Sequence, residues 1–235
     1  MSGFQGAIIA AGRGERLRAT GGASIPKPLV EVGGAPMLVR QARAMLAVGA
    51  SEVLAVINHE TAALSGKIDL PRELKIIVRD TQSSMESLFT LGESLRPGHF
   101  LLATVDAIVP SGEFKRFTSA AQSACVAGEC DGALAVVKWR GDRKPLFTHV
   151  SPAGLIEELG ERPAPMVTAG VYWLPTAVFA LAENARVLKL AAMRGFLAMI
   201  LAKGFRLRAI EVNGAIDIDE AADLDAARRQ VEDRR

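Results

Sequence analysis

The chain has 235 residues, of which 49% are hydrophobic and only 5% aromatic, so mainly aliphatic side chains must build its core. Its 28 basic and 26 acidic residues leave a net charge of +2, which is too balanced for a surface that binds duplex DNA. No apolar stretch approaches the roughly 20 residues that a membrane helix needs. We therefore expect neither nucleic acid nor a membrane among its partners.

The N-terminal segment and the cysteines bear on the cellular compartment. The segment MSGFQGAIIAAGRGERL has only a short apolar run and no basic start, which is untypical of a signal peptide. Cys125 and Cys130 form neither a disulfide framework nor a CxxC pair. These features favour a cytoplasmic protein. The length of the chain suits one domain over residues 1–235, and the oligomeric state stays open.

Apolar runs alternate with helical patterns in chain order. Residues 6–11 (GAIIAA) end in glycines and are typical of a buried parallel strand. A glycine- and arginine-rich loop follows from Gly12 to about Gly34, and Pro36 then marks the start of a helix. The later elements expected from such patterns are strands at 53–57, 74–78, 100–105, 133–137, 167–174 and 205–212, a hairpin at 150–158, and helices from Ser83, from about Ser111, over 188–202 and from about Asp219.

This alternation predicts an α/β fold, a three-layer α/β/α sandwich with a mostly parallel, mixed central sheet. Ligands of such sheets bind at the carboxyl ends of the strands. The loop at 12–34 follows the first strand, and Asp106 follows the strand at 100–105. Both are therefore expected at the ligand-binding edge.

The long loop carries two segments suited to phosphate. In Gly12-Arg13-Gly14-Glu15-Arg16-Leu17, glycines let backbone N–H groups approach a phosphate and arginines add charge. The segment is neither a Rossmann fingerprint nor a P-loop, and a flexible surface loop explains it equally well. In Pro26-Lys27-Pro28-Leu29, two prolines stiffen the backbone around an ammonium group, although an isolated Pro-Lys-Pro is more often a solvated loop.

Taken together, AAGRGERL and PKPLVEVGGAPML resemble the signature of the sugar-phosphate and alcohol-phosphate nucleotidyltransferases. The resemblance covers about residues 7–38 and implies a Rossmann-like nucleotidyltransferase fold. In that family the glycine-rich turn binds the nucleotide, and an arginine and a lysine hold its phosphates. By this resemblance Arg16 and Lys27 are catalytic. The nucleotide-binding residues it implies in the turn are Ala10, Ala11, Gly12, Arg13 and Gly14.

The family also implies a magnesium-binding aspartate after a central strand. Asp106 matches in placement, although Val105 stands where the family usually has glycine, and a turn or capping aspartate is the alternative. Mg²⁺ takes only one or two protein carboxylates, so one more is expected. Asp217 and Asp219 point to the same side of an extended stretch. Because Asp219 also suits the N-cap of the last helix, Asp217 is favoured as the second ligand and Asp219 less so.

Two further segments match the family in part. Gly160-Glu161-Arg162-Pro163 stands where the family often has Glu-Lys-Pro, before the strand at 167–174, so that Arg162 replaces the family's lysine. The acceptor-binding residues implied are Glu161, Arg162, Thr168 and Gly170, and an exposed charged turn is the alternative for Glu161 and Arg162. The segment SSMESL at 83–88 resembles the Asn-Asn-x-x-Ser-Leu of cytidylyltransferases acting on choline or inositol phosphates. It implies a base-reading loop with Gln82, Ser83, Ser84 and Ser87, although Ser83 as a plain helix cap explains much of the pattern.

The resemblance implies a Mg²⁺-dependent enzyme that transfers a nucleoside monophosphate from an NTP, with a pyrimidine favoured. Its acceptor would be a sugar-1-phosphate or an alcohol phosphate, and pyrophosphate would leave. The alternatives are a molybdopterin nucleotidyltransferase-like enzyme, a GT-A glycosyltransferase, and a non-catalytic nucleotide-binding regulator. Joint presence of Lys27, Asp106 and Asp217 argues against the regulator.

Overall fold

The computed structural model describes residues 3–66, 68–141 and 145–232. In this part of the chain, nine strands form one central sheet, with β8 joined to both β11 and β12. The neighbours β6, β1, β4 and β5 run parallel, whereas β11 runs antiparallel to β6 and β8. The strands are β1 (Gln5–Ala10), β2 (Glu31–Val32), β3 (Ala35–Pro36), β4 (Glu52–Ile57), β5 (Leu74–Val78), β6 (His99–Thr104), β7 (Ala107–Ile108), β8 (Gly132–Lys138), β9 (Phe147–Val150), β10 (Ile156–Gly160), β11 (Met166–Pro175), β12 (Leu207–Glu211) and β13 (Ile216–Asp217).

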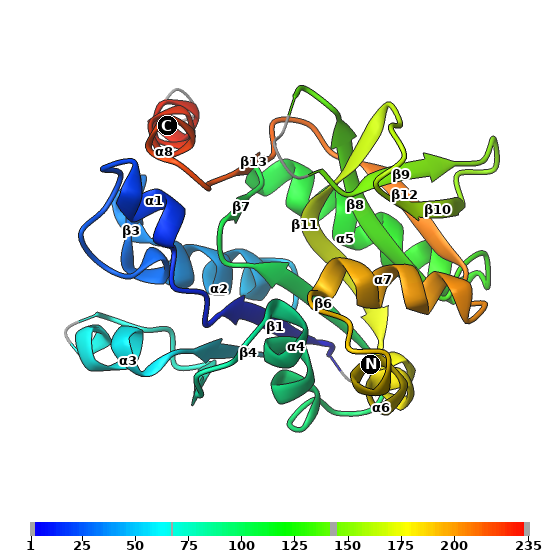
Figure 1. Cartoon of the computed structure of the whole chain (residues 1–235), viewed down its shortest axis with the longest axis horizontal. Helices are drawn as coiled ribbons and strands as arrows, with labels where there is room; N and C mark the ends of the chain where they lie inside the picture. Colours follow the sequence, from blue (N-terminus) through cyan, green and yellow to red (C-terminus); the bar gives the residue numbers. More distant parts are fainter. Residues whose placement is uncertain (1–2, 67, 142–144, 233–235) are drawn as a thin grey trace.

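Helices cover both faces of this sheet (Figure 1). The first face carries α2, α5 and α8, and the second carries α4, α6 and α7. The three-layer α/β/α sandwich with a mixed sheet is therefore confirmed. The helices are α1 (Glu15–Ala19), η1 (Lys27–Leu29), α2 (Met37–Ala47), α3 (His59–Ser65), α4 (Ser84–Gly92), α5 (Ser111–Val126), η2 (Thr176–Leu181), α6 (Ala182–Val187), α7 (Met193–Ala202) and α8 (Ala221–Glu232).

Strand β1 shows why the sheet has a core on each face. Its side chains alternate, so that Ile8 and Ala10 pack on the first face and Ala7 and Ile9 on the second. All of its residues are buried, because parallel neighbours flank it on both sides and helices cover both faces. This explains the continuous apolar run that identified it in the sequence.

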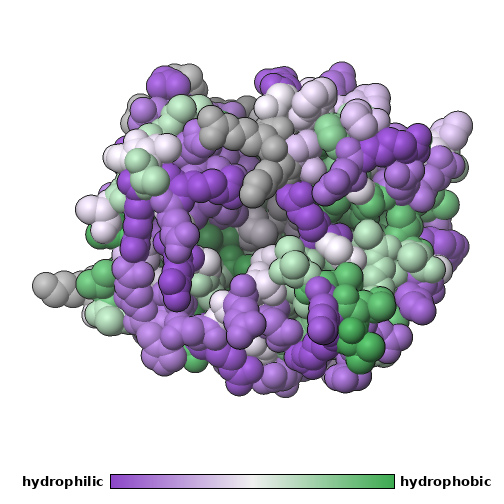
Figure 2. Space-filling view, in the orientation of Figure 1, coloured by the Kyte–Doolittle hydropathy of each residue, from purple (hydrophilic) through white to green (hydrophobic). Residues whose placement is uncertain are grey.

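The surface is mainly hydrophilic in the view of Figure 2, with hydrophobic side chains gathered over α6 and α7. Val187 and Leu188, at the end of α6, are 70% and 63% exposed. No helix in the described ranges is long and apolar enough to cross a membrane.

Two expectations about the helices need correction. The helix expected over 188–202 begins only at Met193, and a separate helix, α6, precedes it. Lys189 lies between them with a φ of 50°, a left-handed conformation that interrupts a helix. Asp219 was expected to cap the last helix, but its carboxylate contacts Arg16 and Lys27, while the Asp223 carboxylate accepts the backbone N–H groups of Asp219 and Glu220 at 3.0 and 2.8 Å.

Strand β11 bends where it passes the end of β6. Its pairing with β8 is irregular between Thr168 and Tyr172, and Gly170 lies in that interval with a φ of 72°. A Cβ atom on Gly170 would lie 2.6 Å from Ala107 Cβ and 2.8 Å from Thr104 Oγ1. Glycine at this position therefore lets β11 approach the turn between β6 and β7 closely.

We predict that Gly170→Ala destabilises the protein by about 2–5 kcal/mol. A left-handed non-glycine residue costs roughly 1–2 kcal/mol, and overpacking adds roughly 1–3 kcal/mol. Urea denaturation gives the free energy of unfolding of both proteins.

The matched control is Gly128→Ala. Gly128 has a φ of 71°, but a Cβ atom on it would have no neighbouring atom within 4 Å, so only the backbone cost of roughly 1–2 kcal/mol applies. Equal losses in the two variants would show that the contact with the turn contributes nothing.

Candidate active site

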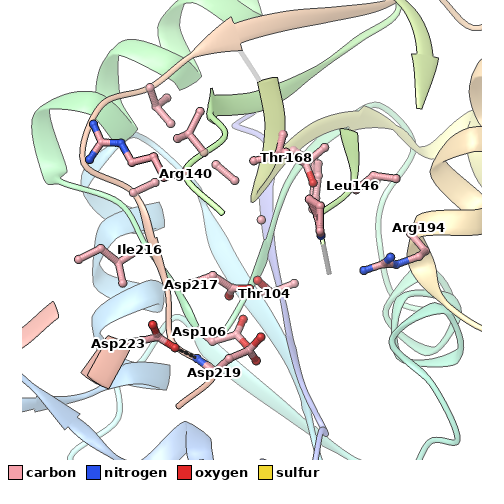
Figure 3. Close-up of a pocket in the computed structure, with 18 of the residues that line it drawn as sticks. Thr104, Asp106, Arg140, Leu146, Thr168, Arg194, Ile216, Asp217, Asp219 and Asp223 are labelled. Carbon is pink, nitrogen blue, oxygen red and sulfur yellow. Dashed lines mark hydrogen bonds between the residues drawn. The ribbon is translucent and has the colours of Figure 1, made fainter. Parts of the chain in front are cut away.

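A pocket of about 910 Å³ opens beside the carboxyl ends of the parallel strands. Figure 3 shows its labelled aspartates in one region and Arg194 across from them. The aspartates come from the β6–β7 turn, from β13, from the segment leading into α8 and from the first turn of α8. The pocket is thus built from segments far apart in the sequence.

The glycine-rich turn connects β1 to α1. Gly14 precedes α1 with a φ of 65°, and a Cβ atom on it would lie 2.9 Å from Lys27 Cβ. Glycine therefore lets Lys27 lie against the turn. Gly12 has open space where a side chain would project. Buried Asn58, which follows β4, fixes the start of the turn, because its Nδ2 donates to the Ala11 carbonyl at 3.1 Å.

Lys27 is the buried cation of the site. Its Nζ atom lies 2.5 Å from Asp106 Oδ2 and 3.4 Å from Asp219 Oδ1, and the residue is 8% exposed. Burial alone lowers the pKa of an ammonium, but the charges of Asp106, Asp217 and Asp219 and the hydrogen bond to Asp106 outweigh this, so the pKa of Lys27 is raised. Lys27 therefore stays protonated.

Asp106 is the anion opposite Lys27. Burial opposes its ionisation, but the charge of Lys27 and hydrogen bonds from Lys27 and Thr104 hold the pKa of Asp106 below its usual range. The side chain thus remains a carboxylate at the end of β6, in the turn that leads into β7.

Asp217 lies beside Asp106, because β13 pairs with β7 and Asp217 stands opposite Ala107. The negative charge of Asp106, with burial and the charge of Asp219, raises the pKa of Asp217 to about 8. Two adjacent carboxylates thus repel each other, and only one is ionised near neutral pH. A divalent cation between them would remove this repulsion.

This donor set fits Mg²⁺. Within residues 3–66, 68–141 and 145–232, no group of three or more histidine, cysteine or acidic side chains is arranged to hold a metal ion. Mg²⁺ needs only one or two carboxylates from the protein, since water and phosphate oxygens complete its coordination. Asp106 and Asp217 meet that requirement.

Arg16 joins the same charge network from α1. Its Nη1 atom lies 2.7 Å from Asp219 Oδ2, and its side chain is 54% exposed. Asp219 therefore lies between Arg16 and Lys27, the two residues expected to be catalytic. The structure brings both of them together with Asp106 and Asp217.

The predicted base-reading loop is only partly at the pocket. Ser84 lines it, and its Oγ accepts the Met193 N–H at 3.2 Å. Ser83 caps α4 by accepting the Glu86 N–H at 3.2 Å, as expected. Ser87 is 1% exposed and bonds to Thr81 at 2.6 Å, while Gln82 is exposed in the loop. The pocket lining does not include residues 10–14.

On the acceptor side, Thr168 and Gly170 line the pocket, whereas Glu161 and Arg162 do not. Both of the latter are exposed beyond β10, and Arg162 pairs with Glu158 at 2.5 Å.

The sequence interpretation missed Arg194, at the start of α7, and Arg140, which follows β8; both line the pocket. Neither lies in a local motif, so only the fold identifies them.

Solved structures resemble the chain over nearly its whole length. The inositol-1-phosphate CTP transferase from T. maritima has a TM-score of 0.80 at 19% identity, covering 99% of this chain and 97% of that one. A putative glucose-1-phosphate thymidylyltransferase from Bacillus anthracis has a TM-score of 0.79 at 15% identity, covering 97% and 95%. A UTP-bound UGPase from Acinetobacter baumannii has a TM-score of 0.77 at 17% identity, covering 97% and 92%. These likenesses show a shared fold.

No curated protein sequence matches the chain significantly. The family model of the MobA-like NTP transferase domain matches residues 6–170, which include the glycine-rich turn, Lys27 and Asp106. The chain therefore belongs to the family of MobA-like NTP transferase domains and is an enzyme of the nucleotidyltransferase class.

Proposed function

We propose that the protein transfers a nucleoside monophosphate from a pyrimidine NTP to a sugar-1-phosphate or an alcohol phosphate in the cytoplasm, with release of pyrophosphate. The observation that carries this proposal is the Lys27 ammonium held between Asp106 and Asp219, with Asp217 beside Asp106, at the carboxyl edge of the sheet. Fixed charges of both signs at one point suit a reaction between two anions.

The reaction is an in-line displacement at phosphorus. An oxygen of the acceptor phosphate forms a bond to the α-phosphorus of the NTP, and the bond from the α-phosphorus to the bridging oxygen of the β-phosphate breaks. That oxygen leaves with the electron pair as part of pyrophosphate. The acceptor phosphate is largely dianionic at pH 7, its second pKa being about 6, so no general base is needed. The enzyme contributes positioning and charge neutralisation.

Lys27 and Arg16 are the cations for the phosphates of the NTP. Lys27 is fixed by its ion pair and remains charged, so it can stabilise negative charge that develops on the leaving pyrophosphate. Arg16 is more exposed and pairs with Asp219, from which it can turn towards a phosphate. The residues that would hold Mg²⁺ are Asp106 and Asp217, and bound there it would neutralise phosphate charge as a Lewis acid.

The opposite wall of the pocket suits the acceptor. Arg194 lies across from the aspartates. Burial and the charges of Asp217 and Asp106 raise the pKa of Tyr172 to about 12, and the charge of Arg194 opposes them, so Tyr172 lies within reach of both walls. A guanidinium binds phosphate through paired N–H groups. Thr168 adds a hydroxyl to the same wall. We therefore assign the acceptor phosphate to Arg194 in place of Arg162.

The choice of a pyrimidine has two supports. The loop at 82–87 resembles that of cytidylyltransferases, and Ser84 lines the pocket. The names of the three structural neighbours refer to CTP, to a thymidylyl group and to UTP. A second acceptor class is molybdopterin, because the matching family is described as MobA-like.

The test is pyrophosphate release with Mg²⁺, crossing four NTPs with sugar-1-phosphates, phosphocholine, inositol phosphate and molybdopterin. We expect release with a pyrimidine NTP and one small acceptor. Release only with molybdopterin would transfer the assignment to the second acceptor class, and release with a purine NTP alone would reject the pyrimidine. Binding of NTP without turnover on any acceptor would support a regulator.

We predict that Lys27→Ala and Asp106→Asn each lower kcat by roughly 100- to 1,000-fold, since each removes a fixed charge at the reacting phosphates. Steady-state pyrophosphate release measures this, and circular dichroism checks the fold. Lys115→Ala is the matched control, because Lys115 is exposed on α5. A variant of Lys27 or Asp106 with near-normal turnover would remove the role assigned to that residue.

We predict that Arg194→Ala raises the KM for the acceptor by roughly 10- to 150-fold, because a hydrogen bond to a charged group contributes about 1.5–3 kcal/mol. The KM for the NTP should change little. The parallel variant is Arg162→Ala, for which the exposed ion pair with Glu158 predicts little change. The reverse result would return the acceptor phosphate to Arg162.

We predict that metal-free protein loses stability as the pH rises from about 5 to about 8.5. An unfolded aspartic acid releases its proton near pH 4, whereas folded Asp217 retains it up to about pH 8. Between these values the folded state binds more protons than the unfolded state, so its stability falls with increasing pH.

Thermal unfolding at several pH values measures this loss, and Asp217→Asn provides the comparison, since it has no carboxyl group to titrate. The Tm of the wild type should fall relative to that of Asp217→Asn as the pH rises. Added Mg²⁺ should stabilise the wild type more at about pH 8.5 than at about pH 6, where a proton competes for the site. Parallel pH profiles of the two proteins would contradict the raised pKa.

A further inference from the structure

A buried glutamine lies beneath the turn that carries Asp106. Gln41 belongs to α2, which packs against the first face of the sheet, and it is only 3% exposed. Its neighbours on the helix, Leu38, Ala42 and Met45, are buried apolar residues of the core. A primary amide in such surroundings is stable only when its polar atoms are bonded.

Gln41 donates to both sides of the turn. Its Nε2 atom lies 3.1 Å from the Thr104 carbonyl oxygen and 2.5 Å from the Ala107 carbonyl oxygen. These two carbonyls flank Val105 and Asp106 in the chain. One amide group, with its two N–H donors, therefore ties together the end of β6 and the start of β7.

Further backbone contacts hold Val105 and Asp106 themselves. The Val105 N–H donates to the Ile9 carbonyl at 3.0 Å, and the Asp106 carbonyl accepts the Ile218 N–H at 3.1 Å. Gly170 packs against Ala107 and Thr104 from β11. Gln41 thus completes a set of contacts that leaves the Asp106 backbone little freedom.

We infer that Gln41 is a positioning residue for Asp106. By holding the Thr104 and Ala107 carbonyls at a fixed separation, it sets the path of the turn and hence the place of the Asp106 carboxylate opposite Lys27 and beside Asp217. The consequence for turnover rests on the proposed function. The consequence for the turn itself does not, so the two can be tested separately.

Another buried glutamine, at the end of β1 away from the site, provides a matched control. Gln5 is 4% exposed, its Nε2 donates to Glu52 at 2.8 Å, and its Oε1 accepts the Arg96 N–H at 2.6 Å. It is the same residue type with similar burial and two hydrogen bonds, but it lies at the amino-terminal end of the parallel strands. Gln5→Met and Gln41→Met therefore remove comparable bonds at different edges of the sheet.

The experiment compares the two methionine variants with the wild type in three measurements. Hydrogen exchange of metal-free protein, followed by mass spectrometry, should show lost protection at 104–108 in Gln41→Met alone. Mn²⁺ binding, followed by electron paramagnetic resonance, should weaken in Gln41→Met, by at most the roughly 10- to 100-fold that follows removal of a direct hydrogen-bond partner of a metal ligand. The Mg²⁺ concentration for half-maximal turnover should rise in the same variant, and Gln5→Met should match the wild type in all three.

The outcomes separate the possible explanations. Unchanged exchange at 104–108 and unchanged Mn²⁺ binding in a folded Gln41→Met protein would overturn the inference and leave Gln41 a purely structural residue. Altered exchange and Mn²⁺ binding without turnover in any form of the protein would support the inference and reject the proposed function.

A second variant covers the case in which Gln41→Met does not fold. Gln41→Asn keeps the amide but shortens the side chain by one methylene, so it reaches the two carbonyls less well without removing the donors. An intermediate loss of protection at 104–108 would support the inference. Protection equal to that of the wild type, with full Mn²⁺ affinity, would contradict it.

Discussion

The ion pair between Lys27 and Asp106 is the interaction on which the site depends. Both groups are removed from bulk water, and each would be costly to bury without the other. The surrounding residues are arranged around this pair. Gly14 gives Lys27 room against the glycine-rich turn, and Gly170 lets β11 close over the turn of Asp106. The segment with two prolines and the end of β6 are thereby brought together although 79 residues separate the partners.

The charges around this pair would not balance if every neighbouring carboxyl group were ionised. Three carboxyl groups, those of Asp106, Asp217 and Asp219, face the cations of Lys27 and Arg16, and the charge of Asp106, with burial and the charge of Asp219, raises the pKa of Asp217. Repulsion between neighbouring carboxylates costs stability in the folded protein, and such strain is typical of functional sites. A bound divalent cation would remove it. The same arrangement that lowers stability thus favours the binding of a metal together with its phosphate ligands.

The sequence predicts those parts of the structure that leave a local pattern. The buried strands appear as apolar runs, and the site residues Arg16, Lys27, Asp106 and Asp217 stand in or near recognisable segments. The break at Lys189 has no such pattern, because residues 188–192 contain neither glycine nor proline to mark it. The role of Asp219 is set by Arg16, 203 residues away in the chain, and that of Gln41 by Thr104, 63 residues away. Arg194 lines the pocket only because the fold packs α7 beside that pocket. Contacts of this kind follow from the fold and not from spacing.

The two ends of the chain form one unit at the active site. The Thr20 Oγ1 accepts the Ala221 N–H at 3.0 Å, and a Cβ atom on Gly22 would lie 3.1 Å from the Ala221 Cα. Helix α8 therefore packs directly against the loop after α1, as Figure 1 shows for the red and blue segments. Because Asp217 and Asp219 immediately precede α8, a shift of the loop after α1 would also shift these carboxylates. The cations for the phosphates and the carboxylates for the metal are thus held in register by the ion pairs of Asp219 and by the packing of the C-terminal helix on the N-terminal loop.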